Sequence, residues 1–145
     1  MSSIVIINGP NLNLLGNREE NIYGNISLDK IKSISIDEAK KLNLNLSFLQ
    51  SNNEGEIIDL IQNAEKAHKG LIINPAAFTH TSIAILDALR AISIPKIEVH
   101  ISNIYQREEY RKKSITASAV NGIICGFGYL SYVLAIQAIY SLIEN

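Results

Sequence analysis

Apolar residues recur along this chain with two different periods, and the two periods alternate. Five short runs are rich in apolar and β-branched residues, as expected of buried strands: Ile4–Asn8, Leu44–Gln50, Leu71–Asn74, Ile97–His100 and Val120–Cys125. Between these runs, apolar residues recur every three or four positions, which is the spacing of amphipathic helices. We expect the helices from Ser27 to about Leu42, from Asn52 or Asn53 to near Lys69-Gly70, around Ile83 to Ile92, and over Ser131–Ile143.

Strands that alternate with helices are typical of βαβ units, whose right-handed crossovers place helices on both faces of a parallel sheet. The sequence therefore predicts a flavodoxin-like, doubly wound α/β fold of five parallel strands in the order 2-1-3-4-5, formed by a single domain over residues 1–145. In such sheets a ligand binds beyond the carboxyl ends of the strands, here between the first and third strands. Chemically capable side chains follow strands one, three and four, whereas the loop after strand two, 51–54, offers fewer of them.

The connection over residues 8–24 is longer than most loops of compact domains, and we expect it to act as a lid over this site. It carries Arg18 and Tyr23, and a cation beside a phenol favours the phenolate, which is a base at neutral pH. Without Arg18, the tyrosine would be interpreted as a loop aromatic that packs. Asn11 can hold a water or stabilise an oxyanion, and it can equally serve to shape the turn after Pro10.

His100 ends the fourth predicted strand, and Glu98 points to the same face of that strand. A carboxylate beside an imidazole fixes its tautomer and favours the protonated ring, which suits a proton donor. A packed histidine that hydrogen-bonds to backbone is an equally good interpretation in isolation. His80 is expected to open the third helix, where the helix dipole disfavours an imidazolium, so we expect a neutral hydrogen-bonding role for it.

Three of the four arginines, Arg18, Arg107 and Arg111, follow predicted strands. Arginine binds carboxylates through a bidentate fork and keeps its charge, so their placement indicates a small anionic ligand. Taken alone, Arg107 and Arg111 would be interpreted as surface partners of the glutamates beside them. The strand-end His100 and Ser102 favour the binding site instead, because α/β ligands bind at strand ends.

The overall charge excludes one class of partner. The chain has 13 Lys and Arg against 14 Asp and Glu, a net charge of -1, so we expect no nucleic-acid partner. Its single cysteine, Cys125, is expected to be a buried, unreactive thiol, which fits a reducing cytoplasm. We find no signal sequence, no run of membrane-spanning length, no metal-ligand spacing and no phosphate-loop glycine motif, so we expect a cytoplasmic protein without metal or membrane partner.

Four blocks of the sequence resemble the type II 3-dehydroquinate dehydratases in order and spacing. They are Asn8–Gly16 with Arg18 and Tyr23-Gly24, Asn74–Ser82, Glu98–Asn103 with Arg107 and Arg111, and Gly122–Gly128. The resemblance implies a cofactor-free anti elimination of water from 3-dehydroquinate, through an enolate, to give 3-dehydroshikimate. This reaction belongs to the shikimate pathway of aromatic amino acid biosynthesis. The resemblance also implies trimers assembled into a homododecamer.

The same resemblance implies a role for each candidate site residue. Tyr23 would take the C2 proton, and Arg18 would hold it as the phenolate. His100 would protonate the departing hydroxyl, and Asn11 would position a water at the enolate. The other residues would bind the substrate or close the site: Asn74, His80, Ile101, Ser102 and Arg111 at its hydroxyls and carboxylate, Arg107 at the lid, and Asp87 from a neighbouring subunit.

A non-catalytic flavodoxin-like module, either a flavin carrier or a phospho-receiver, is the alternative from another functional class. A flavin carrier needs a hydroxyl-rich phosphate loop after strand one, and a receiver needs acidic residues after strands one and three. Asn8 and Asn74 stand at those strand ends, which favours the dehydratase.

Overall fold

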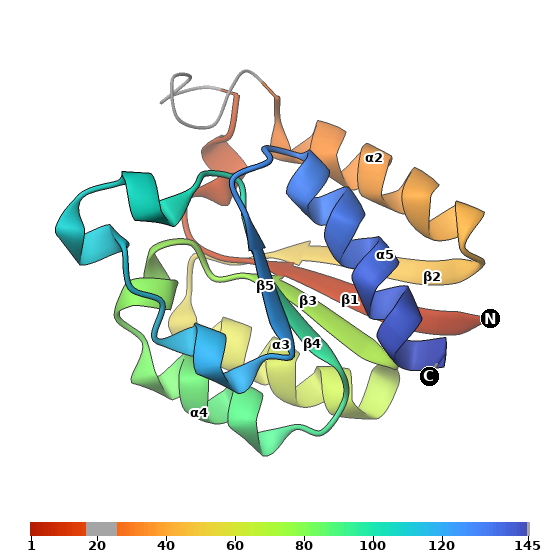
Figure 1. Ribbon diagram of the computed structural model, residues 1–145. Helices are drawn as coiled ribbons and strands as arrows, with labels where there is room; N and C mark the ends of the chain where they lie inside the picture. Colours follow the sequence, from red (N-terminus) through yellow and green to blue (C-terminus); the bar gives the residue numbers. More distant parts are fainter. Residues whose placement is uncertain (17–25, 145) are drawn as a thin grey trace.

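The sheet has the predicted topology. The computed structural model describes residues 1–16 and 26–144, and this part of the chain forms one sheet of five parallel strands. They are β1 (Ser2–Asn8), β2 (Leu44–Gln50), β3 (Gly70–Asn74), β4 (Lys96–His100) and β5 (Gly122–Cys125). Their order is β2-β1-β3-β4-β5, which confirms the doubly wound, flavodoxin-like arrangement (Figure 1).

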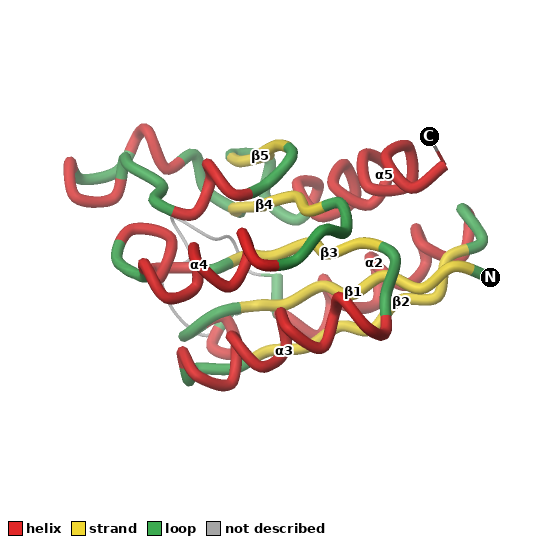
Figure 2. The backbone as a smooth tube through the Cα atoms, turned by 90° about the horizontal axis from the view of Figure 1, so that it is seen from below, coloured by secondary structure: helices red, strands yellow, loops and turns green. Residues whose placement is uncertain are grey.

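Helices cover both faces of this sheet. α2 (Leu28–Lys41) and α5 (Leu130–Glu144) lie on one face, and α3 (Glu54–Ala67) and α4 (Ile83–Ala91) lie on the other, which is the face nearest the viewer in Figure 2. Because successive side chains of a strand point to opposite faces, β1 contributes to two cores. Ile4 and Ile6 pack with α2 and α5, whereas Val5 and Ile7 pack with α3 and α4.

Three of the long helices begin at a side-chain cap, two of them, at Ser27 and Asn53, as predicted. Ser27, Asn53 and Ser82 each accept a hydrogen bond from the backbone N–H three residues later, so each satisfies a donor that the first helical turn leaves free. The end of α3 differs from the prediction. It ends at Ala67, and Gly70 does not cap it but begins β3. A Cβ at Gly70 would lie 2.7 Å from Cγ1 of Ile139 on α5, so the glycine allows α5 to pack closely on the sheet.

Short 3-10 helices occupy the connections at the carboxyl edge of the sheet. The long loop after β1 forms η1 (Leu12–Leu14), and η2 (Ala76–His80) follows β3. Three more follow β4, namely η3 (Ile104–Gln106), η4 (Glu109–Arg111) and η5 (Thr116–Ala119). His80 is therefore the last residue of η2, and the expectation that it opens α4 is wrong because Ser82 caps that helix.

The edge strand β5 is less buried than predicted. Gly122 and Ile123 are exposed, and Cys125 is only partly buried, so the expectation of a fully buried thiol is wrong. The reason is topological, since β5 has a strand neighbour on one side only, which is β4. Within the described residues, every helix is too short or too polar to span a membrane.

Candidate active site

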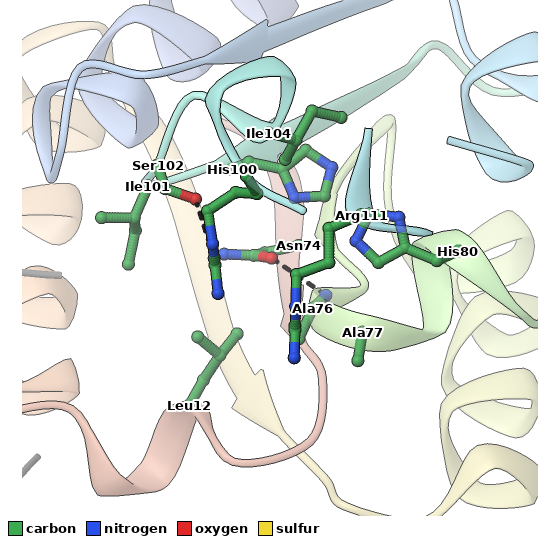
Figure 3. Close-up of a pocket in the computed structure, with 11 residues that line it drawn as sticks. Leu12, Asn74, Ala76, Ala77, His80, His100, Ile101, Ser102, Ile104 and Arg111 are labelled. Atoms are coloured by element: carbon green, nitrogen blue, oxygen red, sulfur yellow. Dashed lines mark hydrogen bonds between the residues drawn. The ribbon is translucent and has the colours of Figure 1, made fainter. Parts of the chain in front are cut away.

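A pocket opens at the carboxyl ends of β1, β3 and β4, where the sequence predicted a site. It is an open, shallow pocket, and its volume is about 370 Å³ when the solvent space at its mouth is included. Figure 3 shows side chains from the loops after all three strands facing this space. The lining residues are Leu12, Asn74, Ala76, Ala77, His80, His100, Ile101, Ser102, Ile104, Arg107 and Arg111.

Most of the candidate site residues meet in this pocket. Its lining contains Asn74, His80, His100, Ile101, Ser102, Arg107 and Arg111. Asn11 is exposed beside the pocket, and Asp87 is exposed on α4 outside the lining. Arg18 and Tyr23 lie outside the described residues.

His100 is held by a buried carboxylate. Its Nε2 lies 2.7 Å from Oε2 of Glu98, and the Glu98 side chain is fully buried. The prediction that the two residues share a strand face is confirmed, and the alternative in which the ring bonds only to backbone is wrong. Burial alone would raise the pKa of Glu98, but hydrogen bonds from His100, Thr116 and Ser114 hold it below its usual value. An ionised carboxylate can only accept, so Nε2 of His100 carries the proton.

Two arginines add positive charge to the lining of the pocket. Arg111 lines the pocket while its Nε lies 2.6 Å from Oε2 of Glu108, so it is both a surface ion-pair partner and a pocket residue. Nη1 of Arg107 donates to the Ser102 hydroxyl at 3.5 Å. The described lining contains two guanidinium groups and two imidazoles and neither a carboxylate nor a lysine. A small anion is the ligand that such a lining favours.

His80 contributes a hydrogen-bonding group. Its Nδ1 lies 2.8 Å from the carbonyl oxygen of Lys113, which can only accept, so Nδ1 carries a proton. The ring faces the pocket (Figure 3). The hydrogen-bonding part of the expectation is met, whereas the helix dipole invoked for it is absent because His80 ends η2 and does not open α4.

Comparison with known proteins assigns this arrangement to a family. The model of the family "Dehydroquinase class II" matches residues 2–140. The chain belongs to the class II dehydroquinase family. It is 58% identical over 139 residues to a 3-dehydroquinate dehydratase of Clostridium botulinum, a match that covers 96% of this chain and 95% of that one.

Solved structures agree with this assignment. The type II dehydroquinase of Butyrivibrio crossotus superposes with a TM-score of 0.93 at 48% identity, covering 95% of this chain and 97% of that one. That of Propionibacterium acnes has a TM-score of 0.94 at 39% identity, and the match covers 97% of each chain. Membership of this family does not favour the flavin-carrier or phospho-receiver alternative.

In this class II dehydroquinase chain, the Asn74 side chain supports the pocket wall through hydrogen bonds to Tyr132 and Ala76. Nδ2 donates to the Tyr132 hydroxyl at 2.9 Å, and Oδ1 accepts from the backbone N–H of Ala76 at 3.1 Å. Ala76 lines the pocket with a φ of 52°, a left-handed conformation that is uncommon for alanine. The Asn74 amide therefore stabilises a strained turn of the binding surface.

Sequence reasoning missed two groups of residues that organise this site. The first is Asn52, whose Oδ1 accepts from Asn11 N–H and from Gln50 Nε2, both at 3.0 Å, so the loop after β2 holds the loop after β1. The second is the set of hydroxyls around Glu98, namely Thr79, Ser114 and Thr116. Only the run of hydroxyl residues before and after Ile115 hinted at the second group.

Proposed function

We propose that this protein dehydrates 3-dehydroquinate to 3-dehydroshikimate by anti elimination through an enolate, as a step of aromatic amino acid biosynthesis. One observation carries the proposal: a carboxylate-held imidazole, His100, shares a pocket with the guanidinium groups of Arg107 and Arg111. The substrate offers the matching groups, since it has a carboxylate for the arginines and a leaving hydroxyl for the imidazole. The names of the relatives support the same reaction.

His100 is the proposed acid. The elimination removes a proton from C2 and a hydroxide from the neighbouring position, so the hydroxide needs a proton in order to leave as water. Nε2 is engaged with Glu98, and Nδ1 has no hydrogen-bond partner among residues 1–16 and 26–144. Nδ1 of the protonated ring is therefore the atom that donates to the leaving hydroxyl.

The proposed base is Tyr23, with Arg18 holding it as the phenolate, and Asn11 positions a water at the enolate oxygen. Support for these three roles comes from the sequence motif, since Arg18 and Tyr23 lie outside the described residues. Asn11 directly precedes the lining residue Leu12, and its φ of 69° directs the chain into η1. No cofactor takes part in this reaction.

The remaining pocket groups bind the substrate. Arg111 takes the carboxylate, and Asn74, His80, Ile101 and Ser102 take hydroxyl and carboxylate oxygens. Arg107 fastens the loop that carries Tyr23. The mixture of guanidinium, imidazole and hydroxyl groups in the lining supports a small hydroxylated acid as the ligand.

The proposed enzyme is a single domain over residues 1–145 that acts in the cytoplasm as a dodecamer of four trimers, in which Asp87 reaches a neighbouring subunit's site. Asp87 is exposed on α4, which is compatible with such a contact. Light scattering coupled to size-exclusion chromatography tests the assembly. We expect a mass of about twelve chains of 16.0 kDa, and a monomer would contradict the assembly without touching the chemistry.

The reaction is tested by mixing the purified protein with 3-dehydroquinate and recording the ultraviolet absorbance of the conjugated enone product. We expect turnover by the wild type and a loss of about 10²–10⁴-fold in kcat for His100→Asn, because the proton donor is removed. His68→Asn is the matched control. Its ring bonds to Ser3 at 2.7 Å, far from the pocket residues, so it should keep wild-type turnover. A wild-type protein that leaves 3-dehydroquinate unchanged contradicts the proposal.

Two further tests address the base and the absence of an imine. Tyr23→Phe and Arg18→Ala should each abolish turnover with the fold intact by circular dichroism. Sodium borohydride added with substrate should leave the enzyme active, since no lysine lines the described part of the pocket. Lasting inactivation by borohydride would indicate a Schiff base instead.

A further inference from the structure

Three hydroxyl side chains surround the carboxylate that holds His100. Thr79 and Ser114 donate to Oε2 of Glu98 at 2.9 Å and 2.8 Å, and Thr116 donates to Oε1 at 2.5 Å. Thr79, Thr116 and Glu98 are fully buried. We call Thr79, Ser114 and Thr116 the hydroxyl cage.

The hydroxyl cage is built for an anion. Thr79 Oγ1 also lies 2.7 Å from both Ser114 Oγ and Thr116 Oγ1, although each hydroxyl has only one proton to donate. A carboxylate is the strongest acceptor within reach, so all three protons point to Glu98. With Nε2 of His100, four donors converge on the two carboxylate oxygens. These hydrogen bonds offset the free-energy cost of burying a charged carboxylate away from water.

The hydroxyl cage also ties together the two segments that carry pocket residues. Thr79 precedes His80 on η2, and Ser114 follows the Arg111 turn. Backbone hydrogen bonds join the same segments, from Ile115 N–H to the Thr79 carbonyl at 2.7 Å and from His80 Nδ1 to the Lys113 carbonyl at 2.8 Å. Because these bonds hold the two segments without the hydroxyls, the loss of one hydroxyl would act first on Glu98 and through it on the acid.

We propose that the hydroxyl cage positions the acid for the proposed dehydration. Thr79, Ser114 and Thr116 hold the Glu98 carboxylate ionised and fixed in place. As a result, His100 keeps its proton on Nε2 and presents Nδ1 to the leaving hydroxyl. The inference rests on the proposed function for its kinetic consequences. None of the three hydroxyls lines the pocket, so they act through Glu98 and not by touching substrate.

Thr116 is the member that isolates this role. Among the described residues, only the Thr116 hydroxyl donates to Oε1 of Glu98, whereas Thr79 and Ser114 donate to Oε2. Ser114 also accepts from the backbone N–H of Ala117, so its removal would disturb η5 as well. Thr116→Val keeps the shape of the side chain and removes the donor, whereas Thr116→Ser keeps the donor and removes a methyl group.

The kinetic test compares these two variants with 3-dehydroquinate as substrate. We expect Thr116→Val to lower kcat about ten- to a hundred-fold with a much smaller change in KM, because the acid is misplaced while the binding groups remain. Thr116→Ser should restore most of kcat. Thr81→Val, at an exposed threonine outside the hydroxyl cage, is the matched control and should behave as wild type.

The pH profile separates positioning from a general loss of structure. With one donor fewer, more of the Glu98 charge faces Nε2–H and stabilises the imidazolium. The alkaline limb of kcat should therefore move to higher pH in Thr116→Val and keep its wild-type position in Thr116→Ser. The other charged or titratable groups of the described lining are His80, Arg107 and Arg111, and all of them remain in this variant.

A spectroscopic readout is independent of turnover. The proton on Nε2 of His100, shared with Glu98, should give a downfield imidazole N–H resonance that disappears in His100→Asn and shifts in Thr116→Val but not in Thr116→Ser. The chain has three histidines, so the assignment is tractable.

Each outcome decides one proposal. If the wild type does not turn over 3-dehydroquinate, the proposed function fails while the resonance still tests the hydroxyl cage. If the wild type is active and Thr116→Val keeps its kcat, pH profile and resonance, the hydroxyl cage has no positioning role. If Thr116→Val does not fold, Thr116→Ala and Thr116→Ser are compared, and equal kcat values in these two overturn the inference.

Discussion

The hydroxyl of Tyr132 connects the ends of two central strands through a fully buried network. It donates to Oδ1 of Asn8 at 2.7 Å and accepts from Nδ2 of Asn74 at 2.9 Å. Nδ2 of Asn8 extends the network, since it donates a hydrogen bond to the carbonyl oxygen of Leu49 on β2 at 3.0 Å. Burial raises the pKa of Tyr132, so the phenol stays neutral and acts only through these hydrogen bonds.

Removing this hydroxyl should lower the stability of the folded protein. In Tyr132→Phe, Asn8 Oδ1 and Asn74 Nδ2 lose their partner in a place that water does not reach, so we expect a loss of about 1–3 kcal/mol in the free energy of unfolding. Urea denaturation measures this loss. Tyr140→Phe in the same helix is the control, because the Tyr140 hydroxyl forms no hydrogen bond to the other described residues. Equal stabilities of the two variants would contradict the network.

The loops after β1 and β3 are packed against each other without room for a side chain. Gly9 N–H donates to the Asn74 carbonyl at 2.7 Å, and a Cβ on Gly9 would lie 2.5 Å from the carbonyl oxygen of Pro75. Backbone cannot move aside as the end of a flexible side chain can. This close approach sets how the loop bearing η1 leaves the sheet beside the turn at Ala76.

Gly9→Ala should therefore force the two loops apart. We expect it to cost about 1–3 kcal/mol in the free energy of unfolding and to lower turnover, because Leu12 and Ala76, which both line the pocket, would move apart. Gly122→Ala at the start of β5 is the matched control. A Cβ there meets no atom within 4 Å, and the change should alter stability by less than about 1 kcal/mol. If Gly9→Ala keeps the wild-type stability and turnover, the close contact between Gly9 and Pro75 does not constrain the two loops.

At the scale of the whole molecule, the buried Glu98 carboxylate makes stability depend on pH. Burial by itself would raise the pKa of Glu98, but its hydrogen bonds hold the folded-state pKa below the ordinary value of 4.5. The folded protein therefore binds this proton less readily than the unfolded chain does. The stabilisation is fully present above pH 4.5 and is lost as the pH falls through the lower, folded-state pKa.

We expect urea denaturation of the wild type to show a free energy of unfolding that falls as the pH is lowered below about 4.5, with part of the slope due to Glu98. Glu98→Gln should be less stable at neutral pH and should lose less on acidification. Glu56→Gln, on the exposed first turn of α3, should keep the wild-type slope. The interpretation fails if Glu98→Gln and the wild type lose stability in parallel.

Much of the fold was predictable because it depends on local patterns. The apolar runs and the amphipathic segments between them determined the five strands, the four long helices and the caps at Ser27 and Asn53, whereas the cap at Ser82 was not predicted. Strand order followed from the handedness of βαβ crossovers, which leaves few arrangements. The pairing of Glu98 with His100 was also predictable, since two positions along a strand lie on one face.

The rest was decided by contacts between residues far apart in the chain. The hydroxyl cage joins Glu98 to residues 16 to 19 positions away, and Tyr132 reaches Asn8 across 124 positions. The exposure of Cys125 depends on β5 being an edge strand, and the role of Asn52 depends on β1 and β2 being neighbours. The sequence by itself determined which elements form and which groups can react. The tertiary structure alone decided which groups support them, because hydrogen bonds between distant segments leave no periodic signal along a chain.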